Sequence, residues 1–495
     1  MPRTIDDIVK KVQENHPQAD TDLVRLAYDY AKEAHHGQRR KSGAYYIEHP
    51  VETAYKLAEL GLDPITIVAA LLHDVPEDTR KTLDDIRDDF GSEVEKLVRG
   101  ITKLGKIKYR GIDRYVENLR RMFVAMAEDI RVILIKLADR IHNLETLDAL
   151  PKDRQKRIAL ESIEIYAPIA NRLGMGELRG NIEDLAFPYV YPKEYHDLKE
   201  RITPRLEEAQ KNMISLIEKT KKLLGEHHVN MISIEGRAKH LYSLYKKLQR
   251  YENDLDRIYD LIAIRIIVPT VSDCYAILGL VHDRWRPLKG RIKDYIAVPK
   301  PNGYQSLHTT VFCDEGKIVE FQIRTLEMHQ LAEWGIAAHW YYKESASHQS
   351  SSFSKDHLPW LEQLEKLHQE SANEKQYLES LKIEVFQDRI FVFTPKGDVI
   401  DLPEDSTPID FAYHIHSDIG HKAIATKVNE ELKPMDTKLR SGDVVEIITD
   451  KNRKGPNSDW LKFVKTPTAR RHIKMWLRRE RRNPLTRLLR WGERA

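Results

Sequence analysis

The sequence predicts a multidomain protein of α and α/β class, with an all-helical domain, an α/β domain with a mixed sheet, and a small β-rich module. Residues 1–190 carry apolar side chains at helical spacing and contain no convincing strand. After about residue 225, runs rich in β-branched residues alternate with helical stretches, as is typical of an α/β domain. A length of 495 residues is enough for several domains of ordinary size.

The helical domain is expected to cover residues 1–190. Its clearest helix is the run Ile65–Leu72, which is almost entirely apolar and is therefore expected to be buried. Helices are predicted at residues 23–34, 51–58, 65–72, 94–97, 115–126, 130–147 and 158–173. One long charged helix over residues 191–225, interrupted near Pro204, is expected to connect this domain to the next.

The α/β domain is expected over residues 226–344. Strands are predicted at residues 230–235, 261–268, 309–312 and 318–323, and helices at 239–251, 271–285 and 325–343. A serine-rich linker and a helix then occupy residues 345–382. The β-rich module is expected over residues 383–450, and a basic helical tail over 451–495.

Charge is nearly balanced over the whole chain but is concentrated at its end. Lys and Arg number 80 against 77 Asp and Glu, which gives a net charge of +3. Residues 451–495 hold 15 Lys and Arg against 3 Asp and Glu, so their local charge is +12. Such a tail is suited to RNA or another polyanion, and it is equally well explained as a solvated helix face.

Cysteine usage and hydropathy indicate the cytoplasm. The two cysteines, Cys274 and Cys313, exclude a disulfide framework and a cysteine zinc site, and they suit a reducing compartment. The first residues lack the apolar core of a signal peptide, and no apolar run is long enough to span a bilayer. We therefore expect a cytoplasmic protein that has no membrane partner.

The first candidate site follows directly after the apolar run Ile65–Leu72. His73-Asp74 and Glu77-Asp78 place four potential metal ligands or proton carriers within six residues. A lone His-Asp pair is usually a capped or salt-bridged helix end, so this segment by itself is a weak signal. Its position after a buried helix makes a solvated face a poor explanation.

Two more segments supply matching side chains. His49 stands at an expected helix start, and Asp139 and Asn143 are four residues apart, hence on one helix face. Two His and two Asp suit Mn, Fe or Zn and leave positions open for water and substrate; the set is His49, His73, Asp74 and Asp139. A metal ion lowers the pKa of bound water and so makes a nucleophile.

Further polar residues surround this set. Glu77 and Asp78, one turn beyond the ligands, are placed to orient the water or carry protons. The turn Arg40-Lys41-Ser42-Gly43 is cationic and suits phosphates, although such a turn alone is usually only solvated.

These residues resemble the signature of the HD-type metal phosphohydrolases, and the wider set is similar to the hydrolase domain of RelA/SpoT-type (p)ppGpp enzymes. The resemblance implies a manganese ion and cleavage of the bond that joins the 3′-pyrophosphate to the nucleotide. The substrate-binding residues that it implies are Arg40, Lys41, Ser42, Arg140, Asn143 and Thr146. Pro76 departs from the family, where an aliphatic residue is expected, and we expect it to shape the helix end.

The second candidate site belongs to the α/β domain. On the predicted strand 318–323 and its continuation, alternation places Val319, Phe321 and Ile323 toward the core. The opposite face then carries Glu320, Gln322 and Arg324 as a candidate site floor, although a plain solvent-facing strand has the same pattern. Asp260 begins another buried strand, and Asp260 with Glu320 suits Mg²⁺ bound to phosphates.

Basic segments are expected to face this floor. Gly236 is expected to permit a tight turn, with Arg237 and Lys239 at the start of the helix that follows. Residues 290–296 and 299–309 are expected to form a basic, glycine-bearing loop in which Tyr304 offers a ring for base stacking. No Walker-type glycine loop is present, so a P-loop enzyme is excluded.

This second set is similar to the synthetase signature of the same family, through runs such as Glu320-Phe-Gln-Ile-Arg324 and Tyr304–Thr309. The resemblance implies transfer of the β,γ-pyrophosphate of ATP to the 3′-OH of GDP or GTP, with Asp260 and Glu320 as catalytic Mg²⁺ ligands. It implies that Arg237, Lys239 and Arg265 hold ATP. The guanine nucleotide is implied to contact Arg291, Lys293, Lys300, Asn302, Tyr304, His308 and Gln322. The basic Arg291-x-Lys293-Asp294 motif resembles the bifunctional branch of the family.

The β-rich module resembles a TGS domain through the run Asp410–His421. In long family members this module contacts uncharged tRNA on the ribosome, which implies a role for His414; a β-grasp fold that only joins domains is the alternative. The basic tail is a second implied contact. Long members continue into further regulatory domains, which the sequence to Ala495 does not include, so it resembles a member truncated after the TGS domain.

Three functions remain open on the sequence. A bifunctional (p)ppGpp synthetase and hydrolase is favoured, because both clusters keep their acids, histidines and basic residues. An HD-domain nucleotide phosphohydrolase without synthetase activity is the second. A ribosome- or tRNA-binding regulator with weak catalysis is the third, and it leaves both acidic clusters unexplained.

Overall fold

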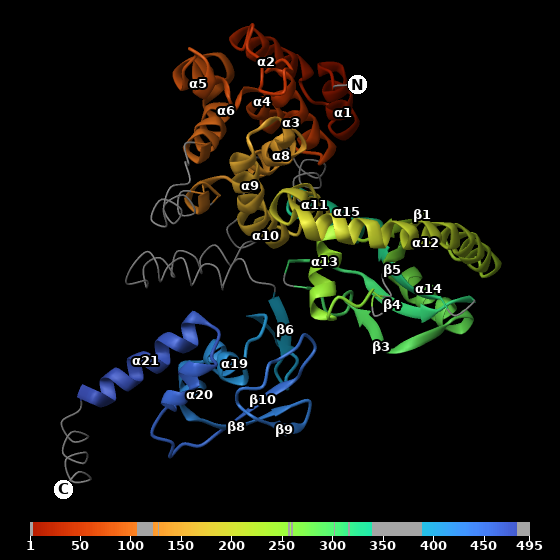
Figure 1. Cartoon of the computed structure of the whole chain (residues 1–495), viewed down its shortest axis with the longest axis vertical. Coiled ribbons are helices and arrows are strands. Elements are labelled where there is room, and N and C mark those ends of the chain that lie inside the picture. The colour runs from red at the N-terminus through yellow and green to blue at the C-terminus, as the bar shows by residue number, and fades with distance from the viewer. Residues whose placement is uncertain are drawn as a thin grey trace. The chain divides into compact units, whose positions relative to one another are not determined.

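The computed structural model describes residues 3–105, 122–126, 128–255, 258, 261–300, 302–314, 317–338 and 389–482. The chain divides into two compact units, Met1–Leu361 and Glu362–Ala495 (Figure 1). The first unit contains a helical region and a five-stranded mixed sheet, and the second contains two small sheets with helices. The predicted fold class is therefore confirmed.

The helical region is built from amphipathic helices around the apolar helix α4 (Pro64–Leu72), in which Thr66–Leu72 are buried. Helices α2, α3 and α6 pack against α4, and α3 packs against α8. No strand occurs among the described residues of 1–190, as predicted; only an isolated bridge joins Arg39 to Tyr45. The helices are α1 Ile5–Asn15, α2 Thr21–Ala34, α3 Glu48–Glu59, α4, α5 Val75–Asp78, α6 Leu83–Gly105, α8 Arg131–Glu145, α9 Lys152–Glu161, α10 Ala167–Arg172 and α11 Gly176–Val190, with a 3₁₀ turn at Leu147–Ala149 and a π turn at Ser162–Tyr166.

The connecting helix α12 (Pro192–Glu226) is continuous, so the predicted interruption at Pro204 is wrong. Proline removes the bond to the carbonyl of the residue four positions earlier, here Glu200. Glu200 is exposed, so water is available to this carbonyl, and α12 passes through Pro204 as helix.

The five-stranded sheet of the first unit has the order β1-β2-β5-β4-β3. β2 and β5 are parallel and the other neighbours are antiparallel, which is the predicted mixed sheet. The strands are β1 Ser233–Ala238, β2 Ile262–Val268, β3 Arg286–Asp294, β4 Leu307–Phe312 and β5 Ile318–Thr325, and the helices between and after them are α13 Leu241–Arg250, α14 Val271–Arg284 and α15 Leu326–Trp334.

The apolar face of this sheet packs on α14 and on the second half of α12 (Figure 1). Phe321 and Ile323 of β5 are fully buried there, as the alternation on this strand predicts. Gly236 lies inside β1 and not in a tight turn, which corrects the expectation for this residue. A Cβ at Gly236 would lie 1.8 Å from Met213 Sδ of α12, so the glycine allows the helix to approach the strand closely.

The first half of α12 belongs to a second apolar cluster. Leu198 and Ile202 of α12 pack with Phe187 of α11 and with Tyr242 and Leu248 of α13. α12 therefore contributes to the core beside the helical region at one end and to the core of the sheet at the other.

The second unit pairs β6 (Arg389–Phe393) with β7 (Val399–Pro403) and orders its other strands β10-β8-β9. The buried carboxylate of Asp410, in the first turn of α19 (Pro408–Ile415), accepts hydrogen bonds from the backbone N–H groups of Thr407, Lys465 and Thr466 at 2.7–3.1 Å. Asp410 thus holds the segment before α21 against α19. The remaining elements are α19 Pro408–Ile415, α20 Ser417–Lys422, β8 Ala423–Val428, β9 Glu431–Lys433, β10 Val445–Thr449, a 3₁₀ turn at Ser458–Lys462 and α21 Pro467–Arg482.

Some predicted elements lie outside the described residues. They are most of the helix at 115–126, the linker and helix at 345–382, the end of the helix at 325–343, and residues 483–495 of the tail. Within the described part of the tail, the α-helix begins only at Pro467, because the preceding residues form turns and a 3₁₀ segment.

Candidate active sites

The first site forms where α4 ends. Pro76 has no N–H to bond the carbonyl of Leu72, and α4 ends at Leu72. The chain restarts as α5, with Pro76 in its first turn, where a helix needs no N–H partner. His73 and Asp74 occupy the break between the two helices, which accounts for the proline that departs from the family pattern.

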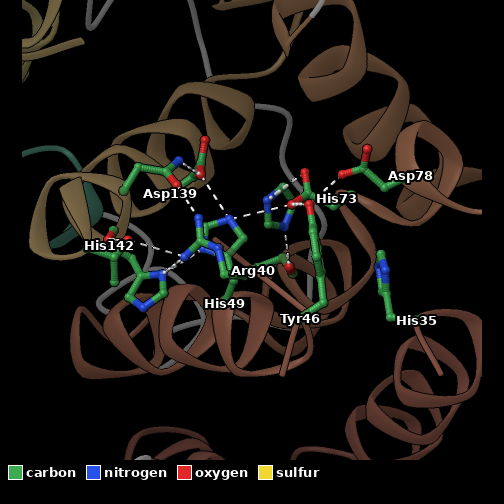
Figure 2. Close-up of polar contacts among 12 residues, drawn as sticks. His35, Arg40, Tyr46, His49, His73, Asp78, Asp139 and His142 are labelled. Carbon is green, nitrogen blue, oxygen red and sulfur yellow. Dashed lines mark hydrogen bonds and ion pairs between the residues drawn. The ribbon is translucent and has the colours of Figure 1, made fainter. Parts of the chain in front are cut away.

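The structure brings the four predicted ligands together (Figure 2). His49 lies in the first turn of α3 and Asp139 in the middle of α8. His49 Nε2 is 3.1 Å from Asp139 Oδ1 and 3.5 Å from Asp74 Oδ2, and His73 Nε2 is 3.2 Å from Asp74 Oδ1. His49, His73 and Asp74 each offer a ligand atom within 4.8 Å of the other two.

The ionisation of this cluster suits a cation. Burial lowers the pKa of His49 and so favours the neutral imidazole, which is the form that binds metals. Burial alone would raise the pKa of the two carboxyls, but neighbouring groups outweigh it. Lys136, 2.6 Å from Asp139 Oδ2, and the adjacent histidines hold the pKa of Asp139 well below its usual range; His73 and His49 lower that of Asp74.

The lone pair of His73 provides a test of whether a metal fits. His73 Nδ1 is 2.7 Å from the carbonyl oxygen of Ala70, to which it donates, so in the neutral ring the buried Nε2 is bare. This Nε2 makes no hydrogen bond and faces a carboxylate oxygen of Asp74. Two acceptors 3.2 Å apart repel each other unless a cation lies between them, so the residues fit a divalent metal.

Three of the predicted substrate residues gather beside the ligands. Arg40 Nη2 donates to Asn143 Oδ1 at 2.6 Å, and Arg40 Nη1 lies 3.4 Å from Thr146 Oγ1. Lys41 and Ser42 are exposed on the adjoining turn. Arg140 is engaged elsewhere: it pairs with Glu161 at 3.2 Å and lies over the ring of Tyr166.

Both acids of α5, Glu77 and Asp78, are largely exposed, but they differ in their contacts. Burial, and next the charge of Asp74, raise the pKa of Glu77. Asp78 accepts a hydrogen bond from the hydroxyl of Tyr46, which also lies 3.0 Å from Asp74 Oδ2. His35 stacks on the Tyr46 ring with centroids 4.4 Å apart, and Figure 2 shows this side of the cluster.

Tyr46, Lys136 and His142 were not among the predicted site residues. Each contacts a predicted ligand: Tyr46 contacts Asp74, Lys136 contacts Asp139, and His142 contacts His49. Spacing carried a usable signal for two of them: Lys136 lies three residues before Asp139 and His142 three residues after it, each one turn away on α8. Tyr46 precedes α3 and contacts Asp74, so helical spacing gave no signal for it.

The second cluster lies on the polar face of the five-stranded sheet. Gln322 Nε2 donates to Glu320 Oε1 at 2.8 Å, and His308 Nδ1 on β4 lies 3.4 Å from the same oxygen. The Tyr304 hydroxyl lies 2.7 Å from His308 Nε2. Lys300 Nζ lies 4.8 Å from the Tyr304 ring centroid, and burial lowers the Lys300 pKa to about 8. The structure thus brings together five of the predicted residues, but Asp260 lies outside the described part of the chain.

Buried arginines extend this face. Arg265 of β2 and Arg324 of β5 share Glu333 Oε1 at 3.2 and 3.1 Å, and Arg265 also pairs with Glu235. Nε of both arginines and Nη2 of Arg265 are buried without a hydrogen-bond partner. Glu235 and Glu333 balance the charge of the two guanidinium groups, but the unpartnered N–H donors remain available to an anion.

The remaining predicted nucleotide residues are placed differently from the expectation. Arg291 and Lys293 lie on the edge strand β3 and not in a loop, and both are exposed. Arg237 lies in β1 and pairs with Glu177 of α11 at 2.6 Å, and Lys239 precedes α13, where its backbone N–H bonds the carbonyl of Leu261. Asn302 is exposed and lies 3.4 Å from the carbonyl of Asn171.

In the second unit, His414 is exposed near the end of α19. Arg478 and Arg479 are on α21, whose Ala469 and Ile473 pack inward against Trp460. No helix among the described residues has the length and apolarity needed to cross a membrane.

Three protein families match separate parts of the chain. The HD domain family matches residues 27–176, the "region found in RelA / SpoT proteins" matches 236–347, and the TGS domain family matches 390–449. The guanosine-3′,5′-bis(diphosphate) 3′-pyrophosphohydrolase of Aquifex aeolicus is 46% identical, over 97% of this chain and 68% of its own length. The chain belongs to the RelA/SpoT family.

Other RelA/SpoT relatives are similar over most of this chain. A GTP pyrophosphokinase of Myxococcus xanthus is 46% identical over 95% of this chain and 62% of its own length. The bifunctional (p)ppGpp synthase/hydrolase RelA of Mycobacterium tuberculosis is 43% identical over 97% of this chain and 65% of its own. The chain thus spans about three fifths of the length of several curated relatives.

Proposed function

We propose that this RelA/SpoT chain both makes and removes the 3′-pyrophosphate of guanosine nucleotides. Synthesis transfers the β,γ-pyrophosphate of ATP to the ribose 3′-OH of GDP or GTP, and hydrolysis returns GDP or GTP plus pyrophosphate. The observation that carries the proposal is that one chain holds two separate clusters: imidazoles with carboxylates, and a sheet face of Glu320 with cationic side chains. Use of ATP and guanine nucleotides would place both reactions in the cytoplasm.

For hydrolysis, we assign manganese to the set His49, His73, Asp74 and Asp139. When bound, the ion supplies a water molecule of lowered pKa as the nucleophile. The raised pKa of Glu77 suits it to hold a proton, and Asp78 is held by Tyr46 in a position to accept one. The substrate is assigned to Arg40, Lys41, Ser42, Arg140, Asn143 and Thr146.

For synthesis, we assign Mg²⁺ to Asp260 and Glu320, with Glu320 beside the 3′-OH that must lose its proton. The phosphates of ATP are assigned to Arg237, Lys239 and Arg265. The ring of Tyr304 is assigned to stacking of the guanine base. The other guanine-nucleotide contacts are assigned to Arg291, Lys293, Lys300, Asn302, His308 and Gln322.

Two assays test the proposal. The protein is incubated with ATP, GDP and Mg²⁺, and separately with ppGpp and Mn²⁺, and the nucleotides are separated by chromatography. His73→Ala is expected to abolish hydrolysis and leave synthesis, because it removes one ligand of the first cluster only. Glu320→Gln is expected to do the reverse. Absence of product in both wild-type assays would refute the assignment, and loss of both activities in either variant would refute two independent sites.

We also propose that the second unit contacts uncharged tRNA on the ribosome, through His414 and the basic helix α21. The exposed histidine and the paired arginines Arg478 and Arg479 support this assignment. Co-sedimentation with ribosomes and uncharged tRNA should weaken as salt rises, and Arg478→Glu with Arg479→Glu should weaken it further. If co-sedimentation changes neither with salt nor with these two substitutions, the basic helix α21 is excluded as the RNA contact.

A further inference from the structure

His142 joins the metal-ligand cluster to a predicted substrate residue. His142 Nδ1 lies 2.7 Å from His49 Nδ1 and 3.2 Å from Arg40 Nη1 (Figure 2). The opposite nitrogen of His49, Nε2, faces Asp139 at 3.1 Å. An unbroken line of contacts thus runs from Arg40 through two imidazoles to a carboxylate of the cluster.

The proton positions along this line follow from the arginine. A guanidinium group only donates hydrogen bonds, so His142 Nδ1 must accept and carries no proton. His49 Nδ1, at 2.7 Å from that bare nitrogen, must then be the donor. A neutral His49 with its proton on Nδ1 has a bare Nε2, and Nε2 is the atom that faces Asp74 and Asp139.

We infer that His142 is a positioning residue of the metal site, which holds His49 in the tautomer that offers Nε2 to the ion. The inference rests on the proposed hydrolase site only for the presence of the metal. His142 is 8% exposed, and its ring is inclined by only 24° to that of His49, with centroids 4.9 Å apart, as fits two rings joined edge to edge. A histidine that merely fills the core would also be buried beside His49, so the test must measure the position of the proton and the affinity for metal as well as stability.

Two variants at one position separate these roles. His142→Asn places an amide oxygen where Nδ1 stands and keeps an acceptor for His49, whereas His142→Leu keeps apolar volume and removes the acceptor. His16→Leu is the matched control, because His16 lies at the end of α1 and bonds the carbonyl of Gly61, away from the ligands. All three variants are made in the full chain, and the thermal midpoint of each is measured without metal.

Mn²⁺ affinity, measured by calorimetry, is the first readout. His142→Leu should weaken Mn²⁺ binding by about 10- to 100-fold, as is usual when the partner of a metal-bound histidine is lost. His142→Asn should bind Mn²⁺ nearly as tightly as the wild type does. The control His16→Leu should have the same Mn²⁺ affinity as the wild type. Equal weakening in the Asn and Leu variants, or unchanged affinity in the Leu variant, would overturn the inference.

The tautomer of His49 is the second readout. In metal-free protein with ¹⁵N-labelled histidine, long-range ¹H–¹⁵N spectra distinguish the protonated from the bare ring nitrogen. Wild type and His142→Asn should show His49 protonated on Nδ1, and His142→Leu should lose this preference. A wild-type His49 protonated on Nε2 would disprove the inference. This spectrum needs neither metal nor substrate, so the result stands apart from failure of the proposed hydrolase activity.

Discussion

A single phenol joins Asp74, one of the predicted ligands, to Asp78 of α5. The Tyr46 hydroxyl lies 3.0 Å from Asp74 Oδ2 and also bonds Asp78. Burial, together with the charges of these two carboxylates, raises the pKa of Tyr46, so the phenol keeps its proton. The hydroxyl has one proton and cannot fully donate it to two carboxylates at once. If a cation binds Asp74, the Tyr46 proton is free to be donated to Asp78 alone.

We therefore predict that Tyr46→Phe lowers the rate of ppGpp hydrolysis by about 10- to 100-fold, because Asp78 loses the group that orients it. Synthesis from ATP and GDP should be unchanged. The matched control is Tyr45→Phe, which changes the exposed neighbour over which Arg39 lies. Unaltered hydrolysis in Tyr46→Phe would show that Asp78 needs no such contact.

At the scale of elements, the contact between α15 and the turn that joins α10 to α11 depends on one glycine. Gly335 has a φ of +55°, and a Cβ there would lie 2.2 Å from the Leu173 carbonyl oxygen and 2.7 Å from Met175 N. These are backbone atoms, which cannot move aside as the end of a side chain can. Ile336 N–H also donates to the Leu173 carbonyl at 2.9 Å.

Gly335→Ala should therefore lower the free energy of unfolding by about 1–3 kcal/mol, the usual effect of overpacking. The measurement is the thermal midpoint of the full chain. Gly279→Ala, in the middle of α14 with no atom within 4 Å of the added Cβ, is the control and should stabilise by about 0.5–1 kcal/mol. Equal midpoints for the two variants would mean that the close approach is not required.

A second contact of α11 depends on pH. His240, which caps α13, lies 2.8 Å from Asp184 and 3.6 Å from Glu177, both on α11. Burial lowers the pKa of His240, but the hydrogen bond to Asp184 and the nearby carboxylate of Glu177 outweigh it and raise the pKa from 6.5 to about 9. A raised folded-state pKa stabilises the fold fully below pH 6.5, and this contribution is lost as the pH rises through about 9.

Between pH 6.5 and 9, the free energy of unfolding of the wild type should therefore fall relative to that of His240→Gln, by on the order of 3 kcal/mol. This fall is the stability that the charged His240 contributes and that is lost when His240 gives up its proton. Thermal midpoints of both proteins across this range provide the measurement. The difference between them should be largest at pH 6.5 and shrink upward. A difference that grows with pH would show that His240 is neutral in the fold.

At the scale of the whole first unit, α11 couples the helical region to the sheet by charge. Glu177 of α11 pairs with Arg237 of β1 at 2.6 Å, and Arg237 is a residue assigned to the phosphates of ATP. A carboxylate here competes with a phosphate for the same guanidinium group. Because simultaneous synthesis and hydrolysis would consume ATP to no purpose, we propose that contacts such as this one keep the two reactions from running together.

Glu177→Gln should then lower the KM for ATP by about two- to fivefold, the range expected when a partly exposed ion pair is removed. Initial rates of synthesis at varied ATP give the value. Glu207→Gln, an exposed position on α12, is the control. A higher KM in Glu177→Gln would show that Glu177 orients Arg237 for ATP instead of competing for it.

Coupling has a reciprocal test at Asp260. Asp260→Ala should abolish synthesis and, if the reactions oppose each other through the fold, raise hydrolysis. The two rates are measured on the same preparation of protein. Unchanged hydrolysis in this variant would count against coupling.

Local pattern was sufficient for much of the fold and for one helix face of the first site. The apolar run Ile65–Leu72 predicted a buried helix, and period-two alternation on β5 assigned Phe321 and Ile323 to the core. The spacing of Asp139 and Asn143 predicted one helix face, and the two side chains are hydrogen-bonded. These results follow from backbone geometry within a few residues, which the sequence alone specifies.

Other features depend on segments that are far apart in the chain. β3 has too few apolar residues to be recognised as a strand, and only pairing with β4 makes it one. Gly236 is needed because Met213 of α12 packs against it. The sequence around Gly236 gives no sign of this distant neighbour. His49 and His142 are 93 positions apart, so the proton that prepares His49 for a metal is decided only when α3 and α8 pack together. The sequence by itself specified which side chains are able to bind a metal, and the tertiary structure decided which nitrogen each one presents, because a tautomer is set by partners that only folding brings within hydrogen-bond distance.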